Sequence, residues 1–329
     1  MKEIEKKMLD GDPIIKSPKI GSVIDFDVKQ DYLDFQKQYL TDFSNLKIAI
    51  DCSNGMAGLL IKDILSDSPL YIHEKPDGNF PGHEPNPLVM KNVRDLQDLV
   101  DKEKCDIGVV FDGDADRVMF VDENSKFVSP DLIIAVLAEY FFVEKGLKGK
   151  VLQDIRTSKS VSEYLHRFGT DVSIWKVGRA FAALKLREID GVYGGELAGH
   201  YYFSDFYYSD SGILACLLVL GIVSKIKEQG KGFSDLINSI SKYANSGEIN
   251  FKIERKQEAM EALKEHFMES ETPVAFYDFD GYRIEFEAWW FNIRPSNTEP
   301  YLRLLVEGNT EGVLKEKLQT IREIIQRFN

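Results

Sequence analysis

Residues 111–117 read Phe-Asp-Gly-Asp-Ala-Asp-Arg and decide the fold, because they place three carboxylates between two apolar runs. The run before them, 107–111, and the run after them, 118–121, have the composition of buried strands. Carboxylates at every second position of one turn repel each other, and a hard cation among their oxygens removes that repulsion. We therefore predict a strand, an acid turn and a second strand, with the acid turn binding Mg²⁺ and leaving positions open for a phosphate oxygen.

The expected ligands of the ion are Asp112, Asp114 and Asp116, and Arg117 is expected to assist by contacting the phosphate. Together with Glu123, the three aspartates also match positions one, three, five and twelve of a calcium-binding loop. That pattern needs glycine at its sixth position and helices on both sides, whereas this chain has Arg117 and strand-like flanks. We reject the calcium loop, and a solvated acidic turn that binds nothing is the alternative.

Composition narrows the class of protein. With 43% hydrophobic and 12% aromatic residues, the 329-residue chain is long enough for two or three domains with buried cores. Its formal net charge of −13 argues against binding to nucleic acid or to an acidic membrane surface. An anionic substrate must then be attracted by a local cluster of arginine, lysine and metal. The longest apolar run, 213–223, is too short to span a bilayer as a helix.

The cysteines indicate a compartment. Cys52, Cys105 and Cys216 are widely spaced and form neither a disulfide framework nor a metal-binding pattern. A reducing environment, the cytoplasm, is therefore the expected location. The first residues of the chain carry no apolar signal core.

Outward from the acid turn, predicted strands and helices alternate. Residues 44–145 read as βαβ units, with the acid turn at the carboxyl end of a strand, where open α/β sheets bind their ligands. The same alternation repeats over 146–245. From 246 to 329, strands precede a terminal amphipathic helix, which predicts a small α+β domain. Residues 1–43 are charged and mixed, and the apolar spacing over 31–43 predicts a helix.

Two further runs carry candidate chemistry. Residues 294–300 read Arg-Pro-Ser-Asn-Thr-Glu-Pro and connect two predicted strands. They form either an ordinary polar hairpin loop or a phosphate clamp, because Arg294 can pair with a phosphate in a bidentate manner and the prolines stiffen the loop. Residues 194–200 read Gly-Gly-Glu-Leu-Ala-Gly-His, a run that offers one carboxylate and one imidazole.

These three motifs, in this order and spacing, resemble those of the α-D-phosphohexomutases, the phosphomannomutase/phosphoglucomutase family. The resemblance covers nearly the whole chain. It implies an α/β fold with two consecutive α/β domains of phosphohexomutase type, 44–145 and 146–245, followed by a small α+β C-terminal domain, 246–329. These would be the last three domains of a four-domain family, with residues 1–43 as a segment and linker from a first domain.

The resemblance further implies an activity. The family moves a phosphoryl group between the 1- and 6-positions of a hexose phosphate through a bound hexose 1,6-bisphosphate, with Mg²⁺ as cofactor. Mannose and glucose phosphates are the expected substrates, and glucosamine phosphate is the alternative within the family. Neither nucleic acid nor a membrane is an expected partner.

The resemblance also assigns roles to single residues. Arg117 and His200 would be catalytic, with His200 as the best candidate for proton transfer. Glu196 would orient the sugar, and the loop 294–300 would hold the phosphate that is not transferred. The full set of expected substrate-binding residues is Glu196, Arg156, Lys176, Arg179, Arg294, Ser296, Asn297 and Thr298.

The chain departs from the family pattern at three positions. Ala198 stands where serine is usual, Arg179 replaces a histidine, and Arg156 stands where lysine is common. Because arginine cannot accept a proton at neutral pH, proton transfer would fall to His200. The two arginines are expected either to bind phosphate or to form surface salt bridges. His83, in a proline-rich loop, is expected to be structural.

The largest departure is an absence. The family transfers phosphate through a phosphoserine in a Ser-His-Asn-Pro-like loop, and no such run occurs in this sequence. The chain would then be a fragment, one half of a split mutase with a separate serine-loop domain as its partner, or a non-catalytic phosphosugar-binding protein.

Overall fold

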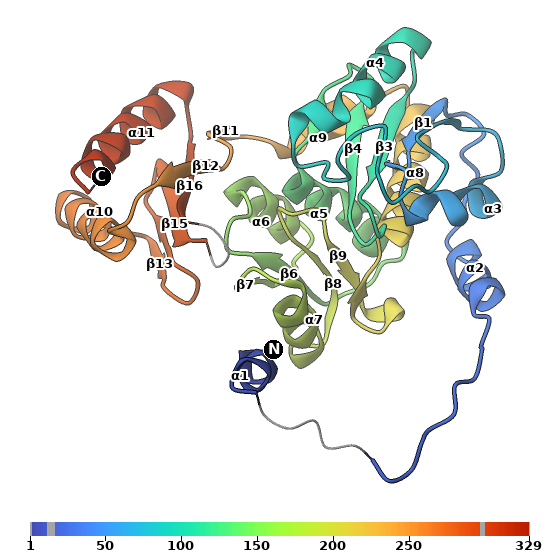
Figure 1. Ribbon diagram of the computed structural model, residues 1–329. Helices are drawn as coiled ribbons and strands as arrows, with labels where there is room; N and C mark the ends of the chain where they lie inside the picture. Colours follow the sequence, from blue (N-terminus) through green and yellow to red (C-terminus); the bar gives the residue numbers. More distant parts are fainter. Residues whose placement is uncertain (1, 12–16, 297–299, 329) are drawn as a thin grey trace.

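The computed structural model describes residues 2–11, 17–296 and 300–328, and its chain forms three sheets (Figure 1). The first sheet has the order β2-β1-β3-β4-β5. β1 pairs in parallel with β2 and β3, whereas β3, β4 and β5 are antiparallel neighbours. The strands are β1 (Ile48–Asp51), β2 (Leu70–Ile72), β3 (Ile107–Phe111), β4 (Val118–Asp122) and β5 (Phe127–Val128). The acid turn, residues 112–117, therefore joins two adjacent strands and starts at the carboxyl end of β3, as predicted.

Helices cover both faces of this sheet because its strands are apolar on both sides. On one face, α4 (Arg94–Glu103) packs Leu96 and Val100 against Ala49 of β1 and Val110 of β3. On the other face lies the apolar helix α8 (Gly212–Glu228), which contacts β4. The short helices η1 (Met56–Leu59) and α3 (Ile61–Leu65) follow β1, and η2 (Met90–Val93) precedes α4.

The second sheet repeats the pattern with the order β10-β9-β8-β6-β7. β6 is parallel to β7 and β8, and β9 and β10 are antiparallel additions. Its strands are β6 (Lys150–Asp154), β7 (Val172–Trp175), β8 (Gly191–Gly195), β9 (Tyr201–Phe203) and β10 (Ser209–Asp210). The helices α6 (Lys159–His166) and α7 (Arg179–Glu188) pack on it, and the 3-10 turn η4 (Ser204–Phe206) follows β9. Helix α9 (Phe233–Ile240) packs on α6 and α8.

One helix joins the two sheets. All nine residues of α5 (Pro130–Ala138) are buried, and the helix packs against α6, α8 and α9 as well as β8. A π-helical turn, η3 (Glu139–Glu144), continues it. One continuous hydrophobic cluster includes Ile50 of β1, Ile134 of α5 and Tyr193 of β8. The first two sheets thus share a core, which fixes the acid turn relative to the second sheet.

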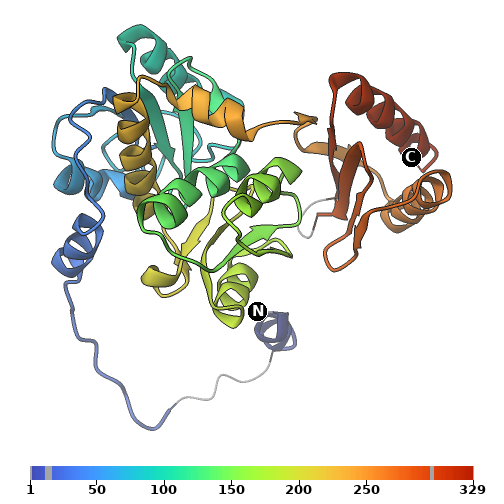
Figure 2. The same cartoon turned by 180° about the vertical axis from the view of Figure 1, so that it is seen from behind.

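The C-terminal part, shown in orange and red, has its own core (Figures 1 and 2). Its sheet has the order β11-β16-β15-β14-β13, with β12 also paired to β16. The helices α10 (Lys256–Ser270) and α11 (Glu311–Gln326) pack on the sheet. The strands are β11 (Ala244–Asn245), β12 (Ile249–Lys252), β13 (Ala275–Tyr277), β14 (Tyr282–Glu285), β15 (Trp289–Pro295) and β16 (Tyr301–Gly308). The fold class predicted from the sequence, two α/β units and a small α+β unit, is confirmed.

The N-terminal region contains α1 (Lys2–Leu9) and α2 (Lys29–Lys37). The helix expected over 31–43 therefore ends at Lys37 and begins two residues earlier. The apolar side of α2 is used, because Phe35 packs against Phe206 with ring centroids 5.3 Å apart. Among the described residues, no helix combines the length and the apolar character needed to cross a membrane.

Candidate functional site

The acid turn brings its three carboxylates together. Oxygens of Asp112, Asp114 and Asp116 lie within 4.8 Å of one another, close enough to share one ion. Asp112 is buried, and its two oxygens accept hydrogen bonds from Nε (2.6 Å) and the backbone N–H (3.2 Å) of Arg117. Burial raises the pKa of Asp112, and the charge and hydrogen bonds of Arg117 oppose that effect. The turn reverses at Ala115, whose φ is +61°.

The second sheet contacts the acid turn directly. The backbone N–H of Val118 donates to the carbonyl of Gly199 (3.2 Å), and Arg117 forms a β-bridge with His200. Nδ1 of His200 lies 2.7 Å from Oδ2 of Asp210 and 3.7 Å from Oδ1 of Asp116. The predicted proton-transfer residue therefore reaches the predicted metal ligands.

The surroundings of His200 favour its charged form. Burial alone would lower the pKa of the imidazole. The hydrogen bond to Asp210 and the negative charges of Asp116, Glu196 and Asp210 outweigh burial, so the pKa of His200 is raised. Because Asp210 accepts from Nδ1, the opposite ring nitrogen is the one left for a substrate.

Arg179, at the start of α7, lies on the open side of the acid turn. Its Nη1 is 2.5 Å from Oδ2 of Asp116, and its Nε is 4.0 Å from Asp210. The side chain is 57% exposed, so it can leave this pairing at low cost. Arg179 is thus placed at the acid turn, where a bound divalent cation would compete with it for the same oxygen.

Glu196 directly follows β8, in the segment that also carries His200. The residue is buried, and its oxygens accept from the backbone N–H of Gly178 (2.7 Å) and the hydroxyl of Tyr202 (3.2 Å). Burial, and then the charge of Asp154, raise the pKa of Glu196. The expected sugar-orienting carboxylate is therefore held by protein donors, which leave its remaining lone pairs as acceptors for a ligand.

Lys176 has apolar neighbours instead of anionic ones. Its Nζ lies 3.9 Å from the ring centroid of Phe181 and 5.9 Å from that of Trp175. Next to it, the backbone N–H of Val177 donates to Asp280 (2.8 Å) of the C-terminal part. The segment that carries Lys176 is thus fixed by its backbone, while the ammonium stays over an aromatic face.

A second cluster forms around Arg156, which follows β6. Its guanidinium pairs with Asp154, with Nη2 to Oδ2 at 2.6 Å and Nε to Oδ1 at 3.2 Å. Oδ2 of Asp154 also accepts from the backbone N–H of Leu197 (2.8 Å). Arg156 is buried, so the alternative of a surface salt bridge is wrong for this residue.

Three arginines meet at one carboxylate. Glu248 lies 3.8 Å from Nη1 of Arg156, 3.5 Å from Nη2 of Arg294 and 3.4 Å from Nη1 of Arg303. Burial lowers the pKa of Arg294, and the charge of Arg156 lowers it further. Nε of Arg294 is buried without a hydrogen-bond partner among the described residues. We call Arg156, Arg294 and Arg303 the arginine cluster, and its excess positive charge suits a dianionic ligand.

Other members of the predicted clamp are only partly described. The backbone N–H of Ser296 donates to the carbonyl of Tyr301 (2.9 Å). Asn297 and Thr298 lie outside the described residues.

The two clusters are joined by one short segment. Residues 196–200 contact Asp154 of the arginine side through Leu197 and Asp116 of the acid turn through His200. A ligand with an anionic group at each end can therefore contact the acid turn with one end and the arginine cluster with the other.

Sequence reasoning missed Asp154, Asp210, Glu248 and Arg303. Arg303 had a usable signal, because hairpin pairing sets it opposite Arg294 in neighbouring strands. Asp154 stands two residues before Arg156 and could have been paired with it from the sequence, whereas Asp210 and Glu248 gave no signal, because each acts on a residue of another element.

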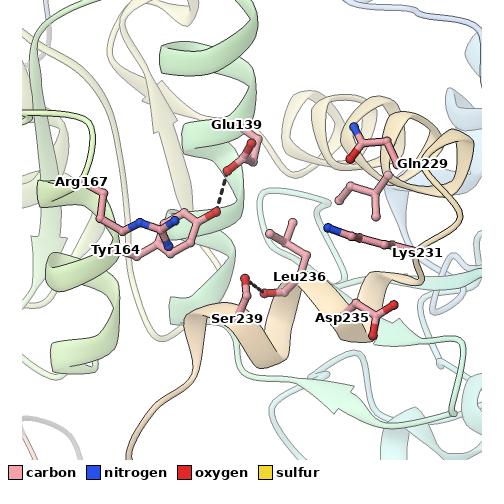
Figure 3. A pocket seen from close by; sticks show the side chains of 9 residues that line it. Glu139, Tyr164, Arg167, Gln229, Lys231, Asp235, Leu236 and Ser239 are labelled. Atoms are coloured by element: carbon pink, nitrogen blue, oxygen red, sulfur yellow. Dashed lines mark hydrogen bonds between the residues drawn. The ribbon is translucent and has the colours of Figure 1, made fainter.

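A hollow lined by residues of η3, α6, α8 and α9 contains no residue of the acid turn or of the arginine cluster (Figure 3). Several of its polar groups pair with one another. The hydroxyl of Tyr164 donates to Glu139 (2.5 Å), that of Ser239 donates to the carbonyl of Leu236 (2.7 Å), and Arg167 stacks on Tyr164. The charges of its rim, from Arg167, Lys231, Glu139 and Asp235, are mixed, so we assign no ligand to it.

The sequence of this chain is similar to those of known proteins. Family models match in chain order: phosphoglucomutase/phosphomannomutase alpha/beta/alpha domain II over residues 30–125, alpha/beta/alpha domain III over 129–243, and the C-terminal domain over 248–324. A phosphomannomutase of Methanocaldococcus jannaschii is 38% identical over 289 residues, which cover 87% of this chain and 63% of that protein. The chain thus spans somewhat less than two thirds of that relative's length, and 66% of a Vibrio cholerae phosphomannomutase that is 35% identical.

Solved structures show the same fold. A phosphoglucomutase/phosphomannomutase family protein of Burkholderia thailandensis superposes with a TM-score of 0.86 at 24% identity, covering 99% of this chain and 69% of that one. An N-acetylphosphoglucosamine mutase of Aspergillus fumigatus, solved in complex with GlcNAc-6P and magnesium, gives a TM-score of 0.62 at 14% identity and covers 90% and 65%. The three family models together cover most of the chain, in the order in which the acid turn, the 196–200 segment and Arg294 occur. The chain belongs to the α-D-phosphohexomutase family, the phosphoglucomutase/phosphomannomutases.

Proposed function

We propose that this chain holds the metal, sugar and phosphate sites of a phosphohexomutase that interconverts hexose 1-phosphate and hexose 6-phosphate through a bound 1,6-bisphosphate. One observation carries the proposal: segment 196–200 connects the acid turn at one end to the arginine cluster at the other. A hexose bisphosphate has two phosphates, and this surface offers each of them a separate charged site. The kinship with phosphomannomutases supports the same activity.

The acid turn fits Mg²⁺. Asp112, Asp114 and Asp116 supply three hard oxygen donors within 4.8 Å of one another, the donor type that Mg²⁺ prefers. When bound, the ion supplies positive charge that stabilises the phosphoryl group in transfer. Arg117 holds one oxygen of Asp112 in place, and Arg179 can turn from Asp116 to a phosphate oxygen. The magnesium in the Aspergillus fumigatus mutase complex agrees with this choice of ion.

His200 is the proposed proton-transfer group. Its imidazole lies between Asp116 and Asp210, whose negative charges raise its pKa against the opposing effect of burial and favour the protonated form. It can donate a proton to the departing hydroxyl oxygen and recover it from the attacking hydroxyl. Arg156 and Arg179 contribute charge only, because neither gives up its proton at neutral pH.

The arginine cluster is the proposed site of the phosphate that is not transferred. That phosphate would displace Glu248 from Arg156, Arg294 and Arg303. Ser296, Asn297 and Thr298 are proposed to add hydrogen-bond donors to this phosphate. Lys176, whose ammonium lies over the ring of Phe181, is proposed to move toward it. Glu196 would accept from sugar hydroxyls. We propose mannose and glucose phosphates as substrates and glucosamine phosphate as the alternative.

The partner of this chain in catalysis is proposed to be a separate serine-loop domain, which would deliver the phosphoserine. A non-catalytic phosphosugar-binding protein is the second candidate, because the arginine cluster could bind a phosphosugar without any transfer of its phosphate. We place the protein in the cytoplasm, because Cys52, Cys105 and Cys216 are all free and buried.

A coupled mutase assay tests the proposal. The chain is given glucose 1-phosphate, Mg²⁺ and a trace of glucose 1,6-bisphosphate, first alone and then with a serine-loop domain of a relative added in trans. We expect no turnover alone and turnover with the added domain. Turnover by the chain alone would mean that another nucleophile is present. No turnover in either case, with glucose 1,6-bisphosphate still bound in calorimetry, would favour the phosphosugar-binding protein.

A further inference from the structure

Two histidines and one aspartate converge beside the acid turn, and the proposed function does not use them. Asp51 is the last residue of β1 and is fully buried. Nδ1 of His73 lies 3.0 Å from its Oδ1, and Nε2 of His83 lies 3.0 Å from its Oδ2. These three donor atoms lie within 4.8 Å of one another.

The second nitrogen of each ring is also held. Nδ1 of His83 lies 2.9 Å from the backbone carbonyl of Glu84, and Nε2 of His73 lies 3.5 Å from Oδ2 of Asp95. Histidines that bind a metal usually donate their other ring N–H to a carbonyl or a carboxylate, which fixes the ring and leaves one nitrogen for the ion. Both rings therefore have the orientation of ligands, and the nitrogens that bond to Asp51 are the ones that an ion would use.

We propose that Asp51, His73 and His83 form a binding site for a divalent transition-metal ion of the zinc class, distinct from the acid turn. Two ligands about 2.0–2.1 Å from one ion, at angles between square and tetrahedral, lie about 2.8–3.4 Å from each other. The two nitrogen-to-oxygen distances of 3.0 Å end on different oxygens of Asp51 and have that spacing, so the carboxylate would bind the ion through both oxygens. Two imidazoles and one carboxylate select Zn²⁺ over Mg²⁺, whereas the all-oxygen acid turn has the opposite preference.

Binding exchanges protons for the ion. Without metal, Asp51 accepts hydrogen bonds from the ring nitrogens of His73 and His83. The ion replaces the protons on these two nitrogens, which pass to solvent, and the carboxylate becomes a ligand. The remaining hydrogen bond to Asp51, from the backbone N–H of Ser53 (2.8 Å), is compatible with that exchange.

The ion would hold the proline-rich loop, residues 76–87, against the acid turn. Asn54 already fixes this loop, because its side chain donates to the carbonyl of Lys75 (2.9 Å) and accepts from the N–H of Gly82 (3.1 Å). Within the loop, Pro85 packs on Gly113 of the acid turn: a methyl group built on Gly113 would lie 3.5 Å from Pro85. A metal at Asp51 and His83 would therefore stabilise the backbone that positions the Mg²⁺ ligands.

Metal analysis of the whole chain tests the site. The protein is equilibrated with Zn²⁺ in excess Mg²⁺, which occupies the acid turn, then dialysed against Mg²⁺ and assayed for zinc by mass spectrometry. We expect one zinc per wild-type chain, loss of that zinc in His83→Gln, and retention in the matched acid-turn variant Asp114→Asn. Substitution Asp95→Asn should weaken zinc binding by about tenfold, because it removes only the group that orients His73.

A measurement on wild-type protein avoids any failure of a variant to fold. With ¹⁵N-labelled histidine, zinc should shift the resonances of Nδ1 of His73 and Nε2 of His83, while those of His166, His200 and His266 stay unchanged. Two results would overturn the proposal: folded wild-type protein that retains no zinc, which leaves a purely hydrogen-bonded cluster, or zinc signals at His200, which would place the ion between Asp116 and Asp210.

Discussion

Asp210 controls the charge of the proposed proton-transfer residue. It lies 2.7 Å from Nδ1 of His200 and stabilises the imidazolium form. Replacing it in Asp210→Asn removes a negative charge and the carboxylate hydrogen bond, so the raised pKa of His200 should fall. An NMR titration of the ring, with the metal chelated, measures this. The control is Asp205→Asn, whose carboxylate instead accepts from Tyr39; an equal pKa in wild type and Asp210→Asn would contradict the role.

Arg294 should dominate the binding of the distal phosphate. Its side chain is largely buried, its Nε has no hydrogen-bond partner among the described residues, and its Nη2 contacts only Glu248 there. A phosphate would supply charged hydrogen bonds to these groups. Arg294→Ala should therefore weaken glucose 1,6-bisphosphate binding by about 1.5–3 kcal/mol in calorimetry. Arg322→Ala, on the exposed side of α11, should leave the affinity unchanged, and equal losses in both variants would argue for a general charge effect.

At the scale of elements, local sequence patterns predicted the strands around the acid turn. The strands that were missed depend on pairing with a neighbouring strand. The strands around the acid turn were predicted within one residue, since runs 107–111 and 118–121 are apolar throughout. The two-residue strands β5 and β10 were not predicted, because they exist only through pairing with β4 and β9. The helix predicted over 31–43 ends at Lys37 although Tyr39 and Phe43 continue the apolar spacing.

In the candidate site, too, one part could be predicted from local sequence and another part could not. Asp112, Asp114 and Asp116 could be assigned from spacing alone, because one turn holds all three. The arginine cluster could not, because it requires Arg156 of the second sheet to meet Arg294 and Glu248 of the C-terminal part. Such a contact depends on how separate domains dock, which no local pattern records.

The backbone segment between β1 and α3 contacts the acid turn and fixes its position. The N–H of Met56 donates to the carbonyl of Gly113 (2.9 Å), and a methyl group on Gly55 would lie 2.6 Å from the same oxygen. Gly55→Ala should therefore displace the turn and weaken Mg²⁺ binding by roughly tenfold, about 1.4 kcal/mol, without touching a carboxylate. Calorimetry with Mg²⁺ measures the change.

Gly78→Ala is the matched control for this prediction, because a methyl group there meets nothing within 4 Å. Equal Mg²⁺ affinity in Gly55→Ala and Gly78→Ala would show that the acid turn tolerates the displacement, and that its backbone position does not limit metal binding.

At the scale of the whole molecule, two kinds of interface meet at the site. The first two sheets share a core through α5 and α8, so the acid turn and His200 are held rigidly. The C-terminal part instead has its own core and docks through contacts that are partly polar: Nη1 of Arg283 donates to the carbonyls of Ile155 (2.8 Å) and Thr157 (2.7 Å), and Phe279 packs on Trp175 (ring centroids 5.5 Å apart). Interfaces with such polar contacts commonly permit domain motion, which the proposed release and reorientation of a bisphosphate would require.

Glu248 is the contact in this interface that a ligand would replace. It is the carboxylate shared by Arg156, Arg294 and Arg303, and it is partly exposed, so its pairing is weaker than a buried one. In Glu248→Gln the arginines lose a competing anion. Inorganic phosphate and hexose phosphates should then bind roughly two- to tenfold more tightly, about 0.5–1.4 kcal/mol.

The same substitution should lower the thermal stability of the ligand-free chain, because three guanidinium groups then repel one another with less compensation. Added phosphate should raise the melting temperature more in Glu248→Gln than in wild type, since it restores the missing anion. Glu254→Gln, an exposed acid nearby in sequence, should change neither quantity. Weaker phosphate binding in Glu248→Gln would instead mean that Glu248 positions the arginines for the ligand, and the arginine cluster would then be a preformed site whose carboxylate stays in place when phosphate binds.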